Sequence, residues 1–183
     1  MFFIKKIFYD VYAGLVFTMK FVMKDLPDIK ELLQLEKQSQ KEGSGIVYTE
    51  LLGIWKFQYV CKKGSDRMDN ISSSILQVLS AKLELNKNKL EDQRHFEIKN
   101  SISFGLLNII FIGTAKLEGF RPILPFYFEK LRINIGNFLI INKPLKKPEE
   151  KKMPFFSLIG ISQENNWMCA RGRGGGLAVW TKL

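Results

Sequence analysis

The chain has few of the residues from which covalent cross-links, metal sites and catalytic triads are usually built. Its 183 residues include two cysteines and a single histidine, His95. Two cysteines are too few for a disulfide scaffold, and Cys61 and Cys169 both lie in alternating apolar runs, which predicts buried free thiols. One histidine leaves no histidine cluster for a metal and no Ser-His-Asp arrangement, so we expect neither a metal nor a cofactor.

Long uncharged runs are also missing. The longest one near the N-terminus lies between Asp10 and Lys20, which is shorter than the roughly 20 residues that a membrane-spanning helix requires. The same segment lacks a small-residue cleavage site, so we predict no cleavable signal peptide and a reducing compartment. The net charge of +10 favours an acidic partner. Because the lysines are scattered and form no nucleic-acid motif, we expect an anionic membrane surface and no nucleic acid.

The composition is that of a globular protein, with 46% hydrophobic and 25% charged residues. Residues 1–24 place most of their charged side chains in one arc of a helical wheel, which predicts a helix lying in a membrane interface. The lysines expected to meet lipid head groups there are Lys5, Lys6, Lys20 and Lys24. Packing of this helix on its own domain or on a partner protein has equal weight. A second helix, capped by Asp25, is predicted from Pro27 to Gln38.

The remainder of the chain alternates between apolar and polar residues, with glycine, proline or asparagine at the reversals. In Leu51 to Val60 the period of two places Trp55, Phe57 and Tyr59 on one face. A reversal is expected over Asn100 to Gly105, and a hairpin turn at Gly136-Asn137. Some eight or nine short strands without intervening helices predict an antiparallel barrel or sandwich. We therefore divide the chain into an N-terminal helical extension, residues 1–43, and a β-domain, residues 44–183.

Two stretches carry a resemblance to a known family. Leu51-Leu52-Gly53-Ile54-Trp55-Lys56-Phe57-Gln58-Tyr59 opens the β-domain, and Arg171-Gly172, Gly175 and Leu177-x-Val179 close it. Both resemble the fibrillins, the plastid lipid-associated proteins, whose Leu-Leu-Gly-x-Trp opening is typical of calycin (lipocalin-like) barrels. The resemblance implies a peripheral protein on the cytoplasmic or stromal side of thylakoid membranes or on lipid globules. It also implies that this protein binds a lipid, prenylquinone or carotenoid without catalysis.

In calycin barrels a basic side chain from the end of the chain covers the conserved tryptophan. We expect Arg171 to cover Trp55, with Arg173 as the alternative, because Trp167, Cys169, Arg171 and Arg173 alternate onto one face. The glycines after Arg173 are expected to form a hairpin turn with positive φ angles at Gly174 to Gly176, since a strand and not a helix follows them.

A barrel of about eight strands can enclose one small ligand. The side chains predicted to line it are Trp55, Phe57, Tyr59, Phe111, Phe126 and Phe128, with Arg121 or Arg171 as a polar anchor. The alternative is that this aromatic stripe is packed core. Two further functions stay open. One is a chromophore lyase, for which the acid–base candidates are His95, Glu97, Glu118 and Glu129. The other is an assembly factor that holds a protein partner through residues 1–24.

Overall fold

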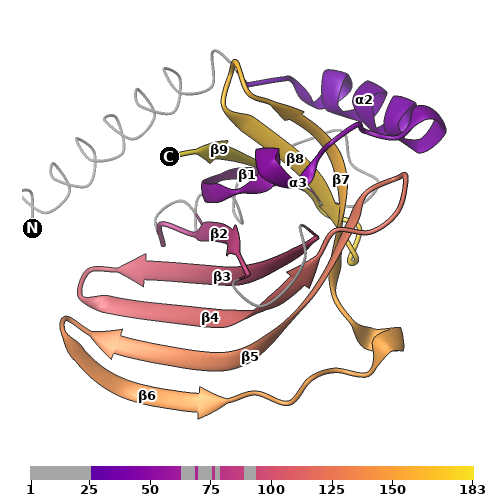
Figure 1. Ribbon diagram of the computed structural model, residues 1–183. Coiled ribbons are helices and arrows are strands. Elements are labelled where there is room, and N and C mark those ends of the chain that lie inside the picture. Colours follow the sequence, from indigo (N-terminus) through magenta and orange to yellow (C-terminus); the bar gives the residue numbers. More distant parts are fainter. Residues whose placement is uncertain (1–25, 63–68, 70–75, 77–78, 89–93) are drawn as a thin grey trace, which may run out of the picture.

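The computed structural model describes residues 26–62, 69, 76, 79–88 and 94–183, and these form a mainly antiparallel β-structure (Figure 1). The predicted helix over residues 1–24, with Lys5, Lys6, Lys20 and Lys24, lies outside the described residues and stays a prediction. The strands are β1 (Gly53–Cys61), β2 (Lys82–Lys87), β3 (His95–Phe104), β4 (Leu107–Lys116), β5 (Ile123–Ile135), β6 (Phe138–Pro144), β7 (Phe155–Ser162), β8 (Trp167–Gly172) and β9 (Leu177–Lys182). The helices are α2 (Ile29–Glu42), α3 (Tyr48–Leu51) and the 3-10 turn η2 (Glu150–Lys152).

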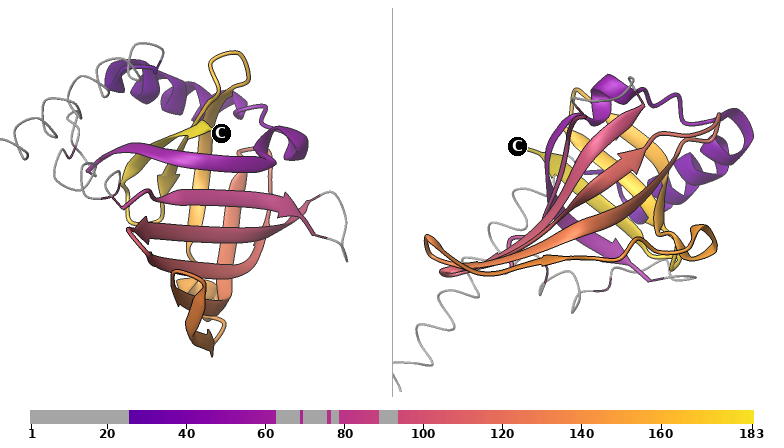
Figure 2. Two further views of the ribbon diagram at one scale, coloured as in Figure 1. Left: turned by 90° about the vertical axis from the view of Figure 1, so that its left-hand side faces the viewer. Right: turned by 60° about the horizontal axis from the view of Figure 1, so that its bottom comes forward.

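The nine strands form one sheet in the order β4-β3-β2-β1-β9-β8-β7-β5-β6, and a further pairing of β4 with β5 closes it into a ring. Of the strands that the structure describes, only β6 lies outside the ring, and it pairs with residues 130–135 of β5. Figure 2 shows that β6 and the adjoining ends of β3, β4 and β5 project from the ring. We call this part, residues 100–112 and 130–144, the extension.

A β-bulge marks the point where the extension leaves the ring. The register between β4 and β5 shifts between Ile112 and Gly113, which leaves Glu129 as an extra residue in β5. A β-bulge bends its strand and increases the local twist. At this point the two backbones approach so closely that a Cβ on Gly113 would lie 1.9 Å from the carbonyl oxygen of Tyr127. Only glycine fits here, so the local sequence itself permits the bend.

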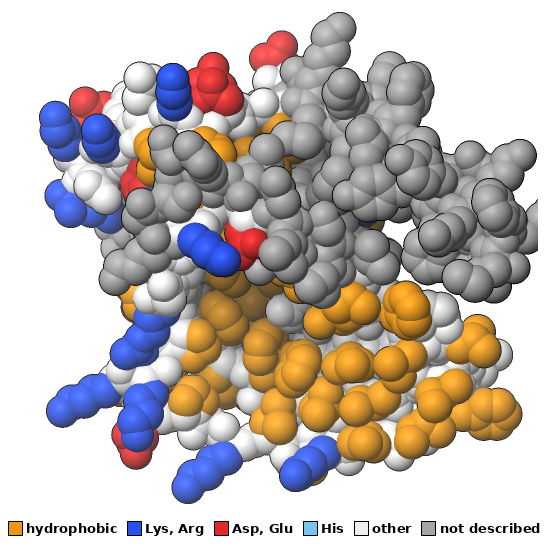
Figure 3. Space-filling model, turned by 180° about the vertical axis from the view of Figure 1, so that it is seen from behind, with side chains coloured by type: hydrophobic (Ala, Val, Ile, Leu, Met, Phe, Trp, Pro, Cys, Tyr) orange, Lys and Arg blue, Asp and Glu red, His pale blue; other side chains and the backbone are white. Residues whose placement is uncertain are grey.

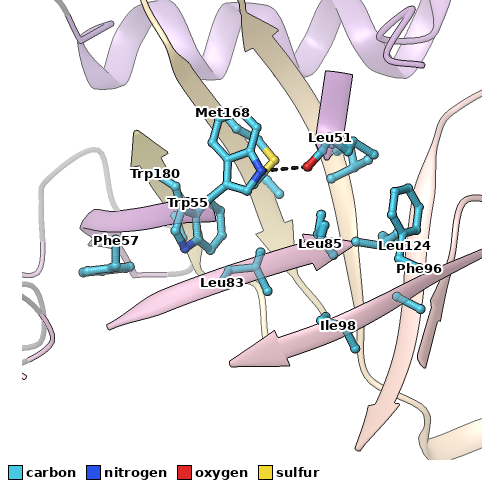
Figure 4. Close-up of a cluster of buried hydrophobic side chains, with 14 of the residues drawn as sticks. Leu51, Trp55, Phe57, Leu83, Leu85, Phe96, Ile98, Leu124, Met168 and Trp180 are labelled. Atoms are coloured by element: carbon cyan, nitrogen blue, oxygen red, sulfur yellow. Dashed lines mark hydrogen bonds between the residues drawn. The ribbon is translucent and has the colours of Figure 1, made fainter. Parts of the chain in front are cut away.

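The enclosed side of the ring holds the larger of two apolar cores (Figure 4). Trp55 is fully buried in it, and Leu51 of the short helix α3 belongs to the same core. The indole N–H donates a hydrogen bond of 2.8 Å to the Leu51 carbonyl. A buried tryptophan normally needs such a partner for its one polar atom. The Gly-x-Trp segment is therefore fixed by packing and by a hydrogen bond.

Helix α2 covers the opposite, outer face of β1, β7, β8 and β9, and the second apolar core lies beneath it. The helix begins with a capping box in which Asp28 and Glu31 each accept a backbone N–H. Its cap is thus Asp28, whereas the sequence predicted Asp25. Among the described residues, none of the helices has the length and apolar character needed to cross a bilayer.

Two further expectations about the chain's reversals are wrong in detail. Asn100 to Phe104 continue β3, and only Gly105-Leu106 turn the chain into β4. In the glycine-rich turn before β9, Gly175 alone has a positive φ, of 88°. The hairpin turn at Gly136-Asn137 is confirmed, with a φ of 57° at Gly136.

Candidate functional site

Lys182, and not Arg171, covers the ring of Trp55. The Lys182 ammonium lies 5.1 Å from the ring centroid, within the range of a cation–π interaction. Trp55 and Lys182 are directly opposite each other in the pairing of β1 with β9, which places both side chains on the same face. A Cβ on Gly53 would lie 2.9 Å from the Lys182 side chain. The glycine of the Gly-x-Trp opening therefore leaves room for the lysine stem.

Arg171 points to the other face of the sheet, where it meets α2. Its guanidinium forms a bidentate ion pair with Glu36, and it also donates a 2.6 Å hydrogen bond to the Gly175 carbonyl. The hydrogen bond to Glu36 raises the pKa of Arg171. The prediction that Arg171 covers Trp55 is wrong, and Arg171 does not anchor a ligand on the enclosed side. Arg173 does not cover Trp55 either, because its guanidinium donates hydrogen bonds to the backbone carbonyls of Met153 and Lys151.

Tyr59 does not share the face of Trp55 and Phe57. A bulge between Phe57 and Tyr59 makes Gln58 an extra residue, so the alternation changes face at this point. Tyr59 lies in the core under α2, where its hydroxyl donates a 2.9 Å hydrogen bond to the Pro27 carbonyl. Burial raises the pKa of its hydroxyl. Tyr59 therefore links β1 to the segment before α2, and the prediction that it shares the face of Trp55 and Phe57 is wrong.

The remaining predicted aromatic residues do come together on the enclosed side. Phe111 and Phe128 have ring centroids 5.3 Å apart, and Phe126 lies 5.5 Å from Phe128. The contacts continue through Phe156 to Trp180, with centroid distances of 5.0 and 5.5 Å. Phe57 ends the series at 6.4 Å from Trp180. We call these residues the aromatic row: Phe111, Phe128, Phe126, Phe156, Trp180 and Phe57.

The aromatic row runs from a packed end to an open end. Phe57 and Trp180 are buried in the closed core. Phe111, Phe126, Phe128 and Phe156 face the same enclosed side but keep part of their surface exposed. These four rings keep solvent-accessible surface and lie at the end of the row next to the extension, which we call the open end. The open end is therefore where a molecule could reach the aromatic row from outside.

The extension continues the same apolar face beyond the ring. Strand register places ten apolar side chains on it, since directly paired residues share a face: Ile102, Phe104, Leu107, Ile109, Phe111, Leu131, Ile133, Ile135, Phe138 and Ile141. Figure 3 shows a broad group of hydrophobic side chains over the extension, with lysine and arginine side chains at its border. Such a contiguous exposed apolar surface is uncommon on a protein that binds nothing.

Sequence reasoning missed Phe156, Trp180 and the extension. The alternation in Leu177 to Thr181 puts Ala178 and Trp180 on one face, so Trp180 could have been found. The run Phe138-Leu139-Ile140-Ile141 gives no alternation from which to assign a face. Arg121, the other predicted anchor, is exposed in the connection between β4 and β5 and is no member of the enclosed cluster.

The acid–base candidates of a lyase lie on the outer face of the sheet. His95 and Glu118 border an outer cleft of about 950 Å³. Glu97 faces outward in an ion pair of 3.0 Å with Lys99, and Glu129 is exposed in the bulge of β5. None of these four therefore supplies a proton donor or acceptor to the aromatic row.

The outer cleft has a different character from the enclosed face. Lys147 lies over the Tyr127 ring at 4.5 Å, and Lys116 pairs with Glu118 at 3.0 Å. Lys151, Glu150 and Arg173 complete its charged lining. The lining of the cleft therefore carries charges of both signs.

The two cysteines are free and buried, as the sequence predicted. Burial raises the pKa of the Cys169 thiol to about 12, and it also raises the pKa of Cys61. Both thiols are thus protonated at neutral pH, which makes them poor nucleophiles. Across the part of the chain that the structure describes, no three His, Cys, Asp or Glu side chains gather in a way that could hold a metal ion.

Comparison with protein-family models and with curated proteins finds no match to this chain. The fibrillin resemblance therefore rests on the two terminal motifs and stays a prediction.

Proposed function

We propose that this protein binds an elongated hydrophobic molecule, of the lipid or isoprenoid class, along its enclosed apolar face. The observation that carries the proposal is the aromatic row, whose inward-facing rings remain partly exposed at the open end. Ligand sites of this kind are largely apolar and aromatic, with few polar groups. The row is continuous with the apolar extension, so the surface suits a long molecule better than a compact one.

The chemistry of the row supports binding without catalysis. Phe111, Phe126, Phe128 and Phe156 offer ring faces and edges, which contribute contact area at low conformational cost and carry no titratable proton. The acid–base candidates lie on the other side of the sheet, as described above. A prenylquinone or carotenoid fits this surface chemically, because each combines a long apolar chain with a planar conjugated system. We propose further that the ring is a lipocalin-like barrel of the fibrillin kind and that the protein works at thylakoid or lipid-globule membranes.

Two neighbouring residues on β5 give a matched test. Phe128 faces the row and Tyr127 faces outward, so Phe128→Trp adds bulk inside the site and Tyr127→Trp adds similar bulk outside it. Binding of a short-chain prenylquinone is measured by titration calorimetry on the full chain. We expect Phe128→Trp to weaken binding at least about tenfold, equivalent to about 1.4 kcal/mol, and Tyr127→Trp to change it less than about twofold.

Thermal unfolding of each variant separates a blocked site from a damaged fold. If the row is solid core, Phe128→Trp should instead overpack it and cost about 1–3 kcal/mol of stability. Failure of the unmodified protein to bind any lipid, prenylquinone or carotenoid would contradict the proposal. Solvent extraction of the purified protein, followed by identification of co-purified molecules, would name the ligand.

A further inference from the structure

The tips of the extension carry the most exposed apolar side chains of its four strands. The β3–β4 and β5–β6 hairpins lie side by side, and the N–H of Gly136 in one turn donates a 2.8 Å hydrogen bond to the Leu106 carbonyl in the other. Leu106 is 71% and Phe138 76% exposed. We call the following residues the hairpin edge: Phe104, Leu106, Ile135, Phe138, Leu139 and Ile140.

The hairpin edge is apolar on both faces of the sheet. Phe138 pairs with Ile135 and so faces the enclosed side, whereas Leu139 pairs with Asn134 and faces the outer side. A protein partner that lies on one face of a sheet leaves the other face in water. A hydrocarbon phase surrounds an inserted tip from all sides, and it therefore covers both Phe138 and Leu139.

The charge of the extension also favours a lipid membrane as its partner. The extension, residues 100–112 and 130–144, contains no aspartate or glutamate, and its three basic residues are Lys130, Arg132 and Lys143. This single sign of charge attracts an anionic surface, with each basic residue near such a surface contributing favourably. Two copies of the chain docked through the extension would bring like charges together, so self-association is disfavoured.

We propose that the hairpin edge inserts into the interface of an anionic lipid bilayer. Strands rise about 3.3 Å per residue, so Arg132 and Lys130 lie roughly 10 and 16 Å behind Ile135 along β5. Lys143 lies at a similar distance behind Phe138 along β6. Interfacial elements bury their apolar side chains by about 5–10 Å, which brings these basic side chains to the level of the lipid head groups.

The free edge of β6 limits how deep the tips can go. Every residue of β6 is exposed, and β5 is its only neighbour among the described strands. Backbone N–H and C=O groups left unpaired in hydrocarbon are costly, whereas water reaches them in the interface. Shallow insertion therefore satisfies both the apolar tips and the unpaired edge. With the tips inserted in this way, the apolar face of the extension connects the bilayer to the aromatic row, so a lipid could move along it. Only this last point rests on the proposed ligand site.

Vesicle flotation tests the membrane contact with a matched control. Phe138 and Phe120 are almost equally exposed, at 76% and 75%, but Phe120 lies in the connection at the opposite ends of β4 and β5. The full chain is used throughout, with vesicles of phosphatidylcholine alone or of phosphatidylcholine with about 30% phosphatidylglycerol. We expect Leu106→Ser with Phe138→Ser to weaken binding to anionic vesicles at least about tenfold. Phe120→Ser should leave it within about twofold of the unmodified protein.

Tryptophan probes report the position directly. Phe138→Trp should gain quenching by brominated lipid, and Phe120→Trp should not. Equal flotation of the Leu106→Ser, Phe138→Ser variant and the unmodified protein would overturn the proposal. It would also be overturned if the unmodified protein sedimented as a dimer without vesicles and the double variant as a monomer. Leu139 faces the outer side, so Leu106→Ser with Leu139→Ser leaves the enclosed face intact; this variant should lose flotation but keep prenylquinone binding in solution, whereas Phe128→Trp should still float. Failure of the ligand site and failure of the membrane contact are therefore distinguishable.

Discussion

The ion pair between Arg171 and Glu36 should be one of the main polar attachments of α2 to the sheet. Both side chains are mostly buried, with 24% and 15% of their surfaces exposed, and the geometry is bidentate. A hydrogen bond to a charged group contributes about 1.5–3 kcal/mol net, and a partner left alone keeps its desolvation cost. We expect Glu36→Gln to lower the free energy of unfolding by about 1.5–3 kcal/mol. Arg171→Met should cost at least as much, because it also removes the hydrogen bond to Gly175.

A double-mutant cycle isolates the pair from these other effects. Urea unfolding, followed by tryptophan fluorescence, is measured for the unmodified protein, both single variants and the double variant. The coupling energy should be at least about 1 kcal/mol, because the two groups are in direct contact. The matched control is Lys152 with Glu149, also an ion pair but with 73% and 75% of the side chains exposed, whose coupling should stay below about 0.5 kcal/mol. A coupling for Arg171 and Glu36 no larger than that of the control would refute the reasoning.

Two further predictions concern the Trp55 contact and the buried thiol. Lys182→Met keeps the aliphatic stem and removes the charge, so it should lower stability by about 0.5–2 kcal/mol, whereas the exposed Lys146→Met should cost less than about 0.5 kcal/mol; equal losses in urea unfolding would contradict the cation–π assignment. Burial raises the pKa of Cys169 from 9.0 to about 12, so its contribution to stability is complete below about pH 9 and is lost as the pH rises toward 12. Above about pH 9 the free energy of unfolding, measured in urea, should fall by up to about 1.4 kcal/mol per pH unit from this thiol, and Cys169→Ala should reduce the slope; an unchanged slope would be evidence against it.

Much of the fold follows from local patterns in the sequence. The alternation of apolar residues predicted most strands, and Gly136-Asn137 predicted a hairpin, because glycine readily adopts the positive φ that the first position of this two-residue turn has. The approximate place of α2 came from the helical spacing of Ile29 and Leu32. The choice of Asp28 as its cap depends on the reciprocal hydrogen bond with Glu31. These features involve neighbours within a few residues, so short stretches of sequence determine them.

The composition of the candidate site was also visible in the sequence, although its boundaries were not. Phe111, Phe126 and Phe128 were predicted inward because they alternate within their strands, and the structure brings them together. Phe156 joins them from a strand that pairs with the start of β5. No local pattern in β7 states which strand will lie beside it. Phe156 could therefore be assigned to the aromatic row only from the strand pairing in the tertiary structure.

The alternation around Trp55 predicted a half-buried strand, and the resemblance to calycin barrels implied that a basic residue near the end of the chain covers its ring. The tertiary structure decided which residue covers it, because the pairing of β1 with β9 places Lys182 opposite Trp55 and Arg171 opposite Leu177. The tertiary structure also decided which side chains of β1 lie on the enclosed face and which lie under α2. One extra residue, Gln58, reverses the alternation of β1 and sends Tyr59 under α2. Register and bulges depend on how distant strands pair, and a shift of one residue exchanges the two faces of a strand; no local stretch of sequence contains that information.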